Sequence, residues 1–274
     1  MNRLYSLCPL IGAAALAFTF SASAQVMMLD FRSPAPSGDS LTNSPYHTVD
    51  SGFTDTIWNV QGQGSDSTLT WSDGTEATGI SYTTFKNGSG GSTSLSAAGW
   101  SGSVTGSVVN TGIYADTSAG ADGYMMTTTF TNNRYIGIQM SGLSNGIYDV
   151  YVSGRNTAYA DPSYTLNYFY STVASTGSYN IASYASESVT FAASSTDKTS
   201  AWVFDSEDPS ASNYVKFTIS ITDENPYFNL AAAGDGVNGI FSSIQIVAVP
   251  EPSSFAMIGG LICLAWVATS RRSR

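Results

Sequence analysis

The stretch SGLSNGIYDVYVSGRN, residues 141–156, indicates most directly how the chain folds. From residue 147 to residue 152 its side chains alternate between two faces, with Tyr148, Val150 and Val152 on one face and Ile147, Asp149 and Tyr151 on the other. The stretch YVKFTISI at 214–221 does the same, and Val215, Phe217, Ile219 and Ile221 share one face. This period of two residues is typical of half-buried antiparallel strands. Asn145-Gly146 precedes the first run and predicts a hairpin turn that joins it to the apolar run at 135–140.

Other short runs rich in β-branched and aromatic residues recur along the chain, separated by Gly, Asn, Asp and Ser. They lie at 26–31, 68–71, 80–85, 124–130, 135–140, 164–170, 202–204, 227–231 and 240–247. Residues 87–120 are rich in Gly and Ser, which fits either a long loop or several weak edge strands. About eleven strands predict an all-β fold, a two-sheet antiparallel β-sandwich of the jelly-roll kind.

The composition excludes some classes of function. Only 11% of the 274 residues are charged, and the net charge is −10. Residues 25–249 contain six basic and nineteen acidic side chains, a net charge of −13. Because nucleic-acid binding needs a basic surface, we expect no nucleic-acid partner.

The amino-terminal 24 residues have the pattern of a secretory signal. Arg3 precedes an uncharged apolar run that ends near Phe20, and the small residues Ala22 and Ala24 suit signal peptidase. We therefore expect a signal helix at 1–24 that is cleaved before Gln25. An uncleaved anchor is the alternative, but the run is shorter than the ~20 residues of a spanning helix.

The carboxyl-terminal tail has three parts in a fixed order. Pro250, Glu251 and Pro252 form a Pro-Glu-Pro motif, residues 253–270 are 18 residues without charge, and the chain ends in Arg271-Arg272-Ser273-Arg274. The apolar part is near the lower limit for a transmembrane helix, and the arginines favour a cytoplasmic end. A plain single-span anchor is the alternative interpretation.

This tail resembles the PEP-CTERM sorting signal of Gram-negative bacteria. The resemblance covers residues 248–274 and implies that an exosortase recognises the motif and cuts the chain near it. The expected organisation is then a signal peptide at 1–24, an exported domain at 25–247 and a sorting signal at 248–274. Cys8 and Cys263 both fall in the end segments, so the exported domain has no disulfide and no thiolate metal site.

Within the domain, three segments resemble galactose-binding-like and malectin-like jelly rolls. They are SGLSNGIYDVYVSGRN at 141–156, VNGIFSSIQIV at 237–247 and VMMLDF at 26–31, although Arg32 replaces the glycine usual after the last. The resemblance implies a β-sandwich and a link to carbohydrate. Sugar sites combine aromatic surfaces with a few polar groups, and the candidates are Trp58, Arg155, Asn156 and Tyr159.

Catalytic and metal-binding candidates are few. His47 is the sole histidine and Asp50 follows it, but no nucleophile motif accompanies them. Asp205, Glu207 and Asp208 form an acidic cluster that suits either a structural calcium ion or a solvated turn. We expect no catalytic residue, no metal site and no other cofactor.

These features favour a non-enzymatic protein of the cell envelope, outer surface or extracellular matrix. Its expected partners are signal peptidase, an exosortase and an extracellular polysaccharide. Two alternatives are an envelope glycan hydrolase that uses paired carboxylates and a structural surface protein that binds no ligand.

Overall fold

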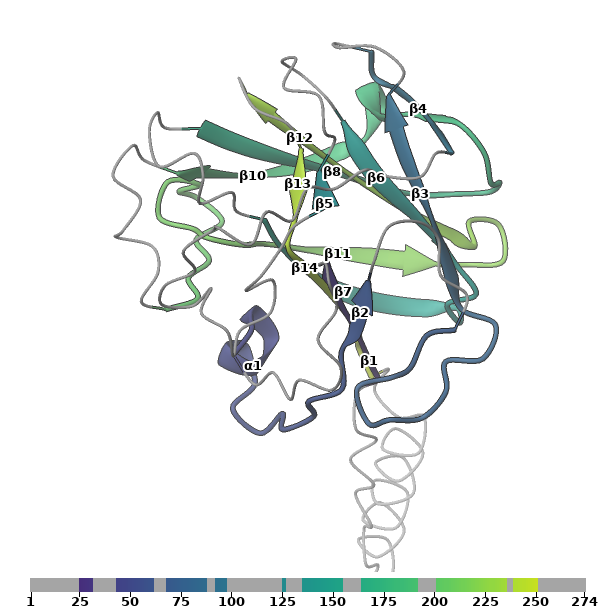
Figure 1. Ribbon diagram of the computed structural model, residues 1–274, viewed down its shortest axis with the longest axis vertical. Coiled ribbons are helices and arrows are strands. Elements are labelled where there is room, and N and C mark those ends of the chain that lie inside the picture. Colours follow the sequence, from purple (N-terminus) through teal and green to yellow (C-terminus); the bar gives the residue numbers. More distant parts are fainter. Residues whose placement is uncertain are drawn as a thin grey trace, which may run out of the picture.

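The computed structural model describes residues 25–31, 43–61, 68–87, 92–97, 125–126, 135–154, 164–191, 201–235 and 239–250. These residues form two largely antiparallel sheets packed face to face, and they confirm the predicted all-β class. In Figure 1 the seven-stranded sheet is the upper layer and the five-stranded sheet is the lower layer. Helical structure within these ranges is limited to α1 (Pro45–Val49) and the single 3₁₀ turn η2 (Ile181–Ser183).

The five-stranded sheet contains the first and last strands of the domain as neighbours. Its order is β11 (Val215–Ile221), β7 (Gly146–Ser153), β14 (Ser243–Ala248), β1 (Val26–Phe31) and β2 (Asn59–Gln61). Every neighbouring pair is antiparallel except β1 and β2, which run parallel. β14 therefore lies at the centre of the sheet, between β7 and β1.

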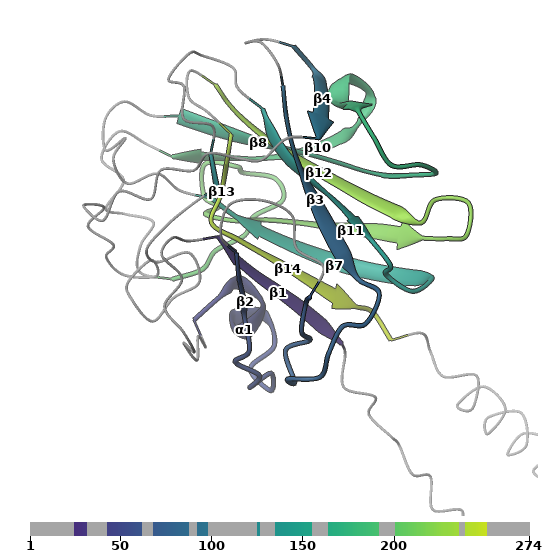
Figure 2. The ribbon, with the colours of Figure 1, turned by 45° about the vertical axis from the view of Figure 1, so that its right-hand side comes forward.

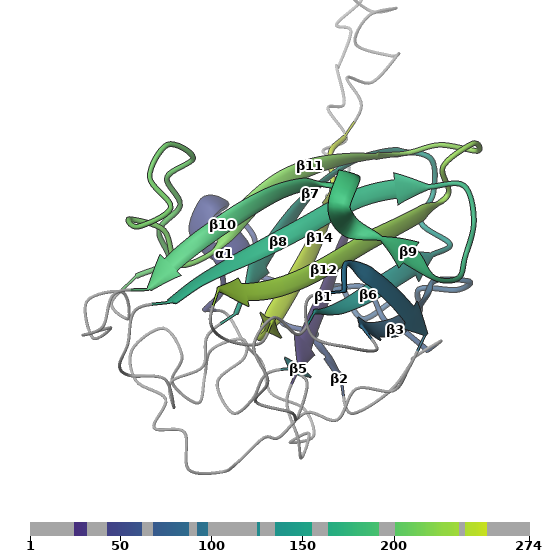
Figure 3. The ribbon, with the colours of Figure 1, turned by 90° about the horizontal axis from the view of Figure 1, so that it is seen from above.

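The seven-stranded sheet covers one face of the five-stranded sheet, as Figure 3 shows from above. Its order is β10 (Ala185–Phe191), β8 (Tyr164–Val173), β12 (Tyr227–Asp235), β6 (Ile136–Ser141), β3 (Ser81–Asn87), β4 (Ser94–Ala97) and β9 (Tyr179–Asn180). A further small pair joins β13 (Ile240–Phe241) to β5 (Met125–Met126).

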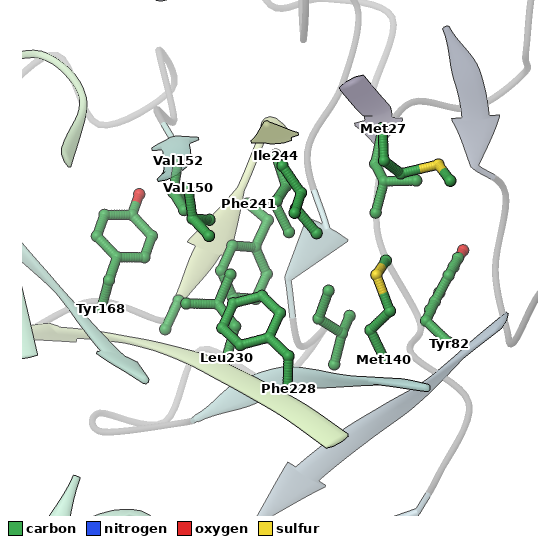
Figure 4. Packing of buried hydrophobic residues seen from close by; sticks show 14 of the residues in the cluster. Met27, Tyr82, Met140, Val150, Val152, Tyr168, Phe228, Leu230, Phe241 and Ile244 are labelled. Atoms are coloured by element: carbon green, nitrogen blue, oxygen red, sulfur yellow. The ribbon is translucent and has the colours of Figure 1, made fainter. Parts of the chain in front are cut away.

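The main core lies between the two sheets and follows the predicted alternation. Tyr148, Val150 and Val152 of β7 point into it, as do Val215, Phe217, Ile219 and Ile221 of β11. From the other sheet, residues such as Met140, Phe228 and Leu230 meet them (Figure 4). The opposite face of β7 includes Ile147, which is 47% exposed. The two faces assigned to each strand from sequence are therefore confirmed.

The hairpin predicted at Asn145-Gly146 is wrong. β6 belongs to the seven-stranded sheet and β7 to the five-stranded sheet, so residues 142–145 cross from one layer to the other. Both edges of each strand are already bonded, β6 to β3 and β12, and β7 to β11 and β14. β6 and β7 therefore cannot pair with each other. The crossing needs glycine at Gly142, where φ is +84° and a Cβ would overlap the carbonyl of Gly79.

Two predicted strands are also absent from the described sheets. Residues 202–204 have no strand structure and cover the outer face of the five-stranded sheet, where Trp202 packs on Tyr214. Residues 68–71 form isolated bridges, Thr70 with Glu76 and Trp71 with Met27. Conversely, the chain forms β10 at Ala185–Phe191, a run whose small polar residues gave no strand signal. Most of 87–120 lies outside the described residues, and β4 falls within it.

Replacing Ile246 with Ala is expected to lower the free energy of unfolding by about 2–5 kcal/mol, because Ile246 is fully buried in the central strand β14. Ile147→Ala is the matched control. It removes the same atoms from a side chain that is 47% exposed, and should change the free energy by less than about 0.5 kcal/mol. Urea denaturation followed by tryptophan fluorescence measures both. Equal losses would contradict the assignment of inner and outer faces.

Candidate functional site

The two ends of the domain meet at one corner. Val26 of β1 lies opposite Val247 of β14. Beyond this pair, the Ala248 amide donates to the Gln25 carbonyl at 2.9 Å, and the Val249 amide donates to the Ile147 carbonyl at 2.9 Å. Figure 2 shows the start of β1 and the end of β14 side by side. We call Gln25, Ile147, Ala248 and Val249 the terminal corner.

The predicted export and sorting residues adjoin this corner in the sequence. Pro250 is described and exposed, one residue beyond the last amide bonded to the sheet. Ala22, Ala24, Glu251, Pro252 and the apolar run 253–270 lie outside the described residues. In the part of the chain that the structure describes, no helix is long and apolar enough to cross a membrane.

The opposite end of the domain is the far rim, which we define by Phe31, Ser153, Tyr164 and Asp235. Within the five-stranded sheet, Asp30 pairs with Ser243 and Ser243 with Ser153, and within the seven-stranded sheet Asp235 pairs with Thr165. The two sheets come together at this end, where Gly154 packs against Tyr168. The candidate sugar-binding residues Arg155, Asn156 and Tyr159 lie outside the described residues, between the end of β7 and the start of β8. Both of those strand ends are at the far rim.

Gly154 determines how the chain leaves β7 at the far rim. A Cβ at this position would overlap the Tyr168 hydroxyl and the Ile240 carbonyl. The same hydroxyl donates to the Ile240 carbonyl at 3.3 Å. The backbone of Gly154 therefore packs against β8 and β13 closely enough to exclude a side chain. This contact fixes the position from which the segment containing Arg155 begins.

Trp58, the fourth candidate sugar-binding residue, is buried with 8% of its surface exposed. It belongs to a second core on the outer face of the five-stranded sheet. The other members are Val26, Met28, Tyr46, Tyr151, Trp202, Tyr214 and Val247, with Phe53 and Phe204 half-buried against them. The rings form a continuous series, with centroids 5.5 Å apart for Tyr46 and Tyr151 and 6.2 Å apart for Tyr151 and Tyr214. In this position Trp58 presents little surface to a ligand and contributes mainly packing.

This second core attaches α1 to the sheet. The Tyr46 amide donates to the Gln245 side-chain oxygen at 3.0 Å, and Gln245 is fully buried in β14. Beside the rings, Lys216 Nζ lies 2.8 Å from an Asp149 oxygen and 5.5 Å from the centroid of Tyr151. Burial, and then the nearby Asp149 and Asp50, raise the pKa of Tyr151 to about 12. Tyr151 therefore stays protonated at neutral pH.

Apart from Trp58, these outer-face residues carry no local sequence pattern that predicts a second core. Tyr46, Tyr151 and Tyr214 come from three separate segments, and their assembly depends on α1 folding onto the sheet. One feature of the sequence did point to this core. The alternation in β7 places the aromatic Tyr151 on the face expected to meet solvent, which suggests that something covers that face.

His47 connects α1 to the loop that follows it. Its Nδ1 lies 2.7 Å from the Ser44 hydroxyl, and its Nε2 lies 2.8 Å from the Asp55 carbonyl oxygen. Ser44 is fully buried and caps the helix. Asp50 accepts hydrogen bonds from the Gly52 amide and the Tyr46 hydroxyl. The Ser44 hydroxyl is thus inaccessible to a substrate, and this set of residues holds the helix in place.

The acidic cluster at 205–210 forms a turn through its own carboxylates. Asp205 Oδ1 accepts from the amides of Glu207 and Asp208 at 2.9 and 3.2 Å. Asp208 Oδ1 accepts from the Ser210 amide and hydroxyl at 2.8 and 2.6 Å. Such side-chain contacts to nearby amides are typical of Asx turns. Over the described ranges, no three His, Asp or Glu side chains converge in a way that could hold a metal ion.

Acidification is expected to destabilise the domain through His47. Burial lowers the pKa of His47 below its ordinary value of 6.5, although its hydrogen bond to Asp55 opposes this. The unfolded chain therefore binds the proton more readily, so the stabilisation is complete above pH ~6.5 and is lost as the pH falls toward the folded-state pKa. The melting temperature should therefore decrease between about pH 7.5 and 5.5, the range around the ordinary histidine pKa.

The control is His47→Gln, which cannot titrate in this range. Its melting temperature should depend less on pH than that of the wild type. An identical dependence in the two proteins would contradict the role given to His47.

Comparisons with known proteins assign no family. No family model and no curated protein matches the chain. Among solved structures, it is similar to a family GH115 4-O-methyl-alpha-glucuronidase with specificity for decorated arabinogalactans, at 7% identity and a TM-score of 0.25. The alignment covers 47% of this chain and 15% of that chain, so this chain spans a small part of that enzyme. A likeness at this level supports no conclusion on fold or activity.

Proposed function

We propose that this protein is an exported cell-envelope or extracellular-matrix protein that an exosortase sorts through its carboxyl-terminal tail. In this proposal the domain is a non-enzymatic jelly roll, preceded by a cleaved signal helix and followed by a transmembrane helix. The supporting observation is the terminal corner, where the hydrogen bond from Ala248 to Gln25 brings the two ends of the domain together. The signal and the sorting tail then attach at one point, and the rest of the sandwich stays free of both.

Pro250 is suitably placed for a protease. Regular sheet pairing stops there because proline has no amide hydrogen to donate. The exposed Pro250 follows directly on Val249, whose amide is still bonded to Ile147. Cleavage near the Pro-Glu-Pro motif would leave every strand of the domain intact. The proposed processing is thus compatible with a folded substrate.

In this proposal, the polysaccharide binds at the far rim. Arg155 and Asn156 follow directly on Gly154, whose close packing fixes the start of the segment. Arginine offers several donors in a rigid fork to sugar hydroxyls. The net charge of −13 for residues 25–249 opposes polyuronates, so the proposed ligand is a neutral glycan.

Changing Pro250, Glu251 and Pro252 together to Ala is expected to leave full-length protein in the membrane, because the sorting protease loses its recognition motif. Immunoblots of membrane and released fractions measure the two forms. Val249→Ala is the control, since it alters the residue next to the motif and should mature as the wild type does. Normal release of the triple variant would favour a plain anchor over the sorting signal.

Arg155→Ala is expected to weaken binding of a neutral glycan by about tenfold, equal to about 1.4 kcal/mol, with little change in melting temperature. Asp223→Ala removes an exposed charged side chain beside the start of β7, at the opposite end of the domain, and is the control. A glycan array followed by calorimetry tests both variants. Unfolding of the Arg155 variant would indicate a buried structural role. If the wild type binds no glycan, the structural surface protein becomes the better description.

A further inference from the structure

The terminal corner exposes two neighbouring apolar side chains. Ala248 pairs with Tyr148, so Val249 continues the register opposite Ile147, and their backbones are hydrogen bonded. Ile147 is 47% exposed and Val249 is 38% exposed. Single exposed apolar residues are common on protein surfaces and need no explanation. This pair differs because it lies directly before the apolar run that begins at Ser253.

The distance from the corner to that run is short. Only residues 250, 251 and 252 separate Val249 from Ser253. Val249 and Ser253 are thus four residue steps apart, which span at most about 14 Å even when the chain is fully extended. β7 has 8 residues from Gly146 to Ser153, and its length is about 23 Å at the usual strand rise. If residues 253–270 enter a membrane, the corner must lie near its surface, and the far rim can lie farther out by up to about the length of β7.

We infer that the sandwich rests on the lipid surface at its terminal corner, with Ile147 and Val249 in contact with the interface and the far rim directed outward. This inference depends on the proposed membrane tail and adds an orientation to it. The orientation explains how one end of the domain is reserved for anchoring while the segment that begins at Arg155 stays accessible. The terminal corner thus binds the lipid surface rather than another protein.

The charged side chains near the terminal corner indicate which lipid headgroup charge favours contact. Asp223 accepts a hydrogen bond from the Asn145 side chain at 2.7 Å, which places it beside the start of β7, and the exposed Glu224 follows it. The turn containing Asp73 adjoins β1, because the Ser72 amide donates to the Val26 carbonyl at 2.9 Å. These carboxylates would be repelled by an anionic surface. We therefore expect contact with zwitterionic lipid and weaker contact as anionic lipid is added.

Site-specific fluorescence tests the orientation, because the domain contains no cysteine of its own. In a full chain with Cys8 and Cys263 changed to Ser, Ile147→Cys receives an environment-sensitive dye. Val203→Cys is the matched control, since Val203 is 44% exposed and lies in the segment that leads into the far-rim end of β11. Val249→Cys gives a second label at the corner. The proteins are placed in phosphatidylcholine vesicles that carry a spin-labelled lipid as quencher.

The labels at 147 and 249 should be quenched several-fold more strongly than the label at 203, and added phosphatidylserine should reduce the difference. Equal quenching at all three sites would overturn the orientation. So would shielding of the corner labels that persists in detergent without lipid, which would instead indicate contact between copies of the chain. If the protein fails to float with the vesicles, the membrane tail itself is wrong, and this result separates failure of the proposed function from failure of the orientation.

Discussion

The fold depends on the antiparallel pairing of its first and last strands. β1 is bonded to β14 along five residue pairs from Val26 to Asp30, whereas its other neighbour, β2, contributes three. β14 in turn pairs with β7, so it joins both halves of the five-stranded sheet. The sheet therefore cannot close until the chain is complete to residue 248. Such long-range pairing folds slowly, which suits a chain that would cross a membrane unfolded before its final strand arrives.

The same pairing defines two opposite ends of the domain. At the terminal corner, the hydrogen bond from the Ala248 amide to the Gln25 carbonyl holds the first and last residues of the domain side by side. At the far rim, Gly154 packs against Tyr168 and the chain departs from the sheet. The second core, built around Tyr46, Tyr151 and Tyr214, fastens α1 on the outer face between these ends. One strand register therefore sets both the terminal corner and the position of the far rim relative to it.

The sequence predicts local features of this fold better than its connections. Alternation in β7 and β11 correctly gives the buried face, because that face follows from the period of a strand alone. Asn145-Gly146 suggested a hairpin because the turn residues are right, but strand partners depend on which edges are free, and those edges are filled by distant segments. The burial of Trp58 is likewise not a local feature, because the other members of the second core come from distant parts of the sequence. The terminal corner required the pairing of Val26 with Val247, which no local pattern specifies.

Disulfide trapping measures this pairing most directly. Gln25→Cys and Ala248→Cys would occupy facing positions, since Val26 lies opposite Val247 and the Ala248 amide donates to the Gln25 carbonyl. Facing residues in antiparallel strands have Cα atoms about 4.5–5.5 Å apart, within the range a disulfide needs. Val249→Cys with Gln25→Cys is the control, because side chains alternate and Val249 points to the other face. With Cys8 and Cys263 changed to Ser, mild oxidation of the folded protein should cross-link the first pair and spare the second. Equal cross-linking of both pairs, or of neither, would contradict the pairing.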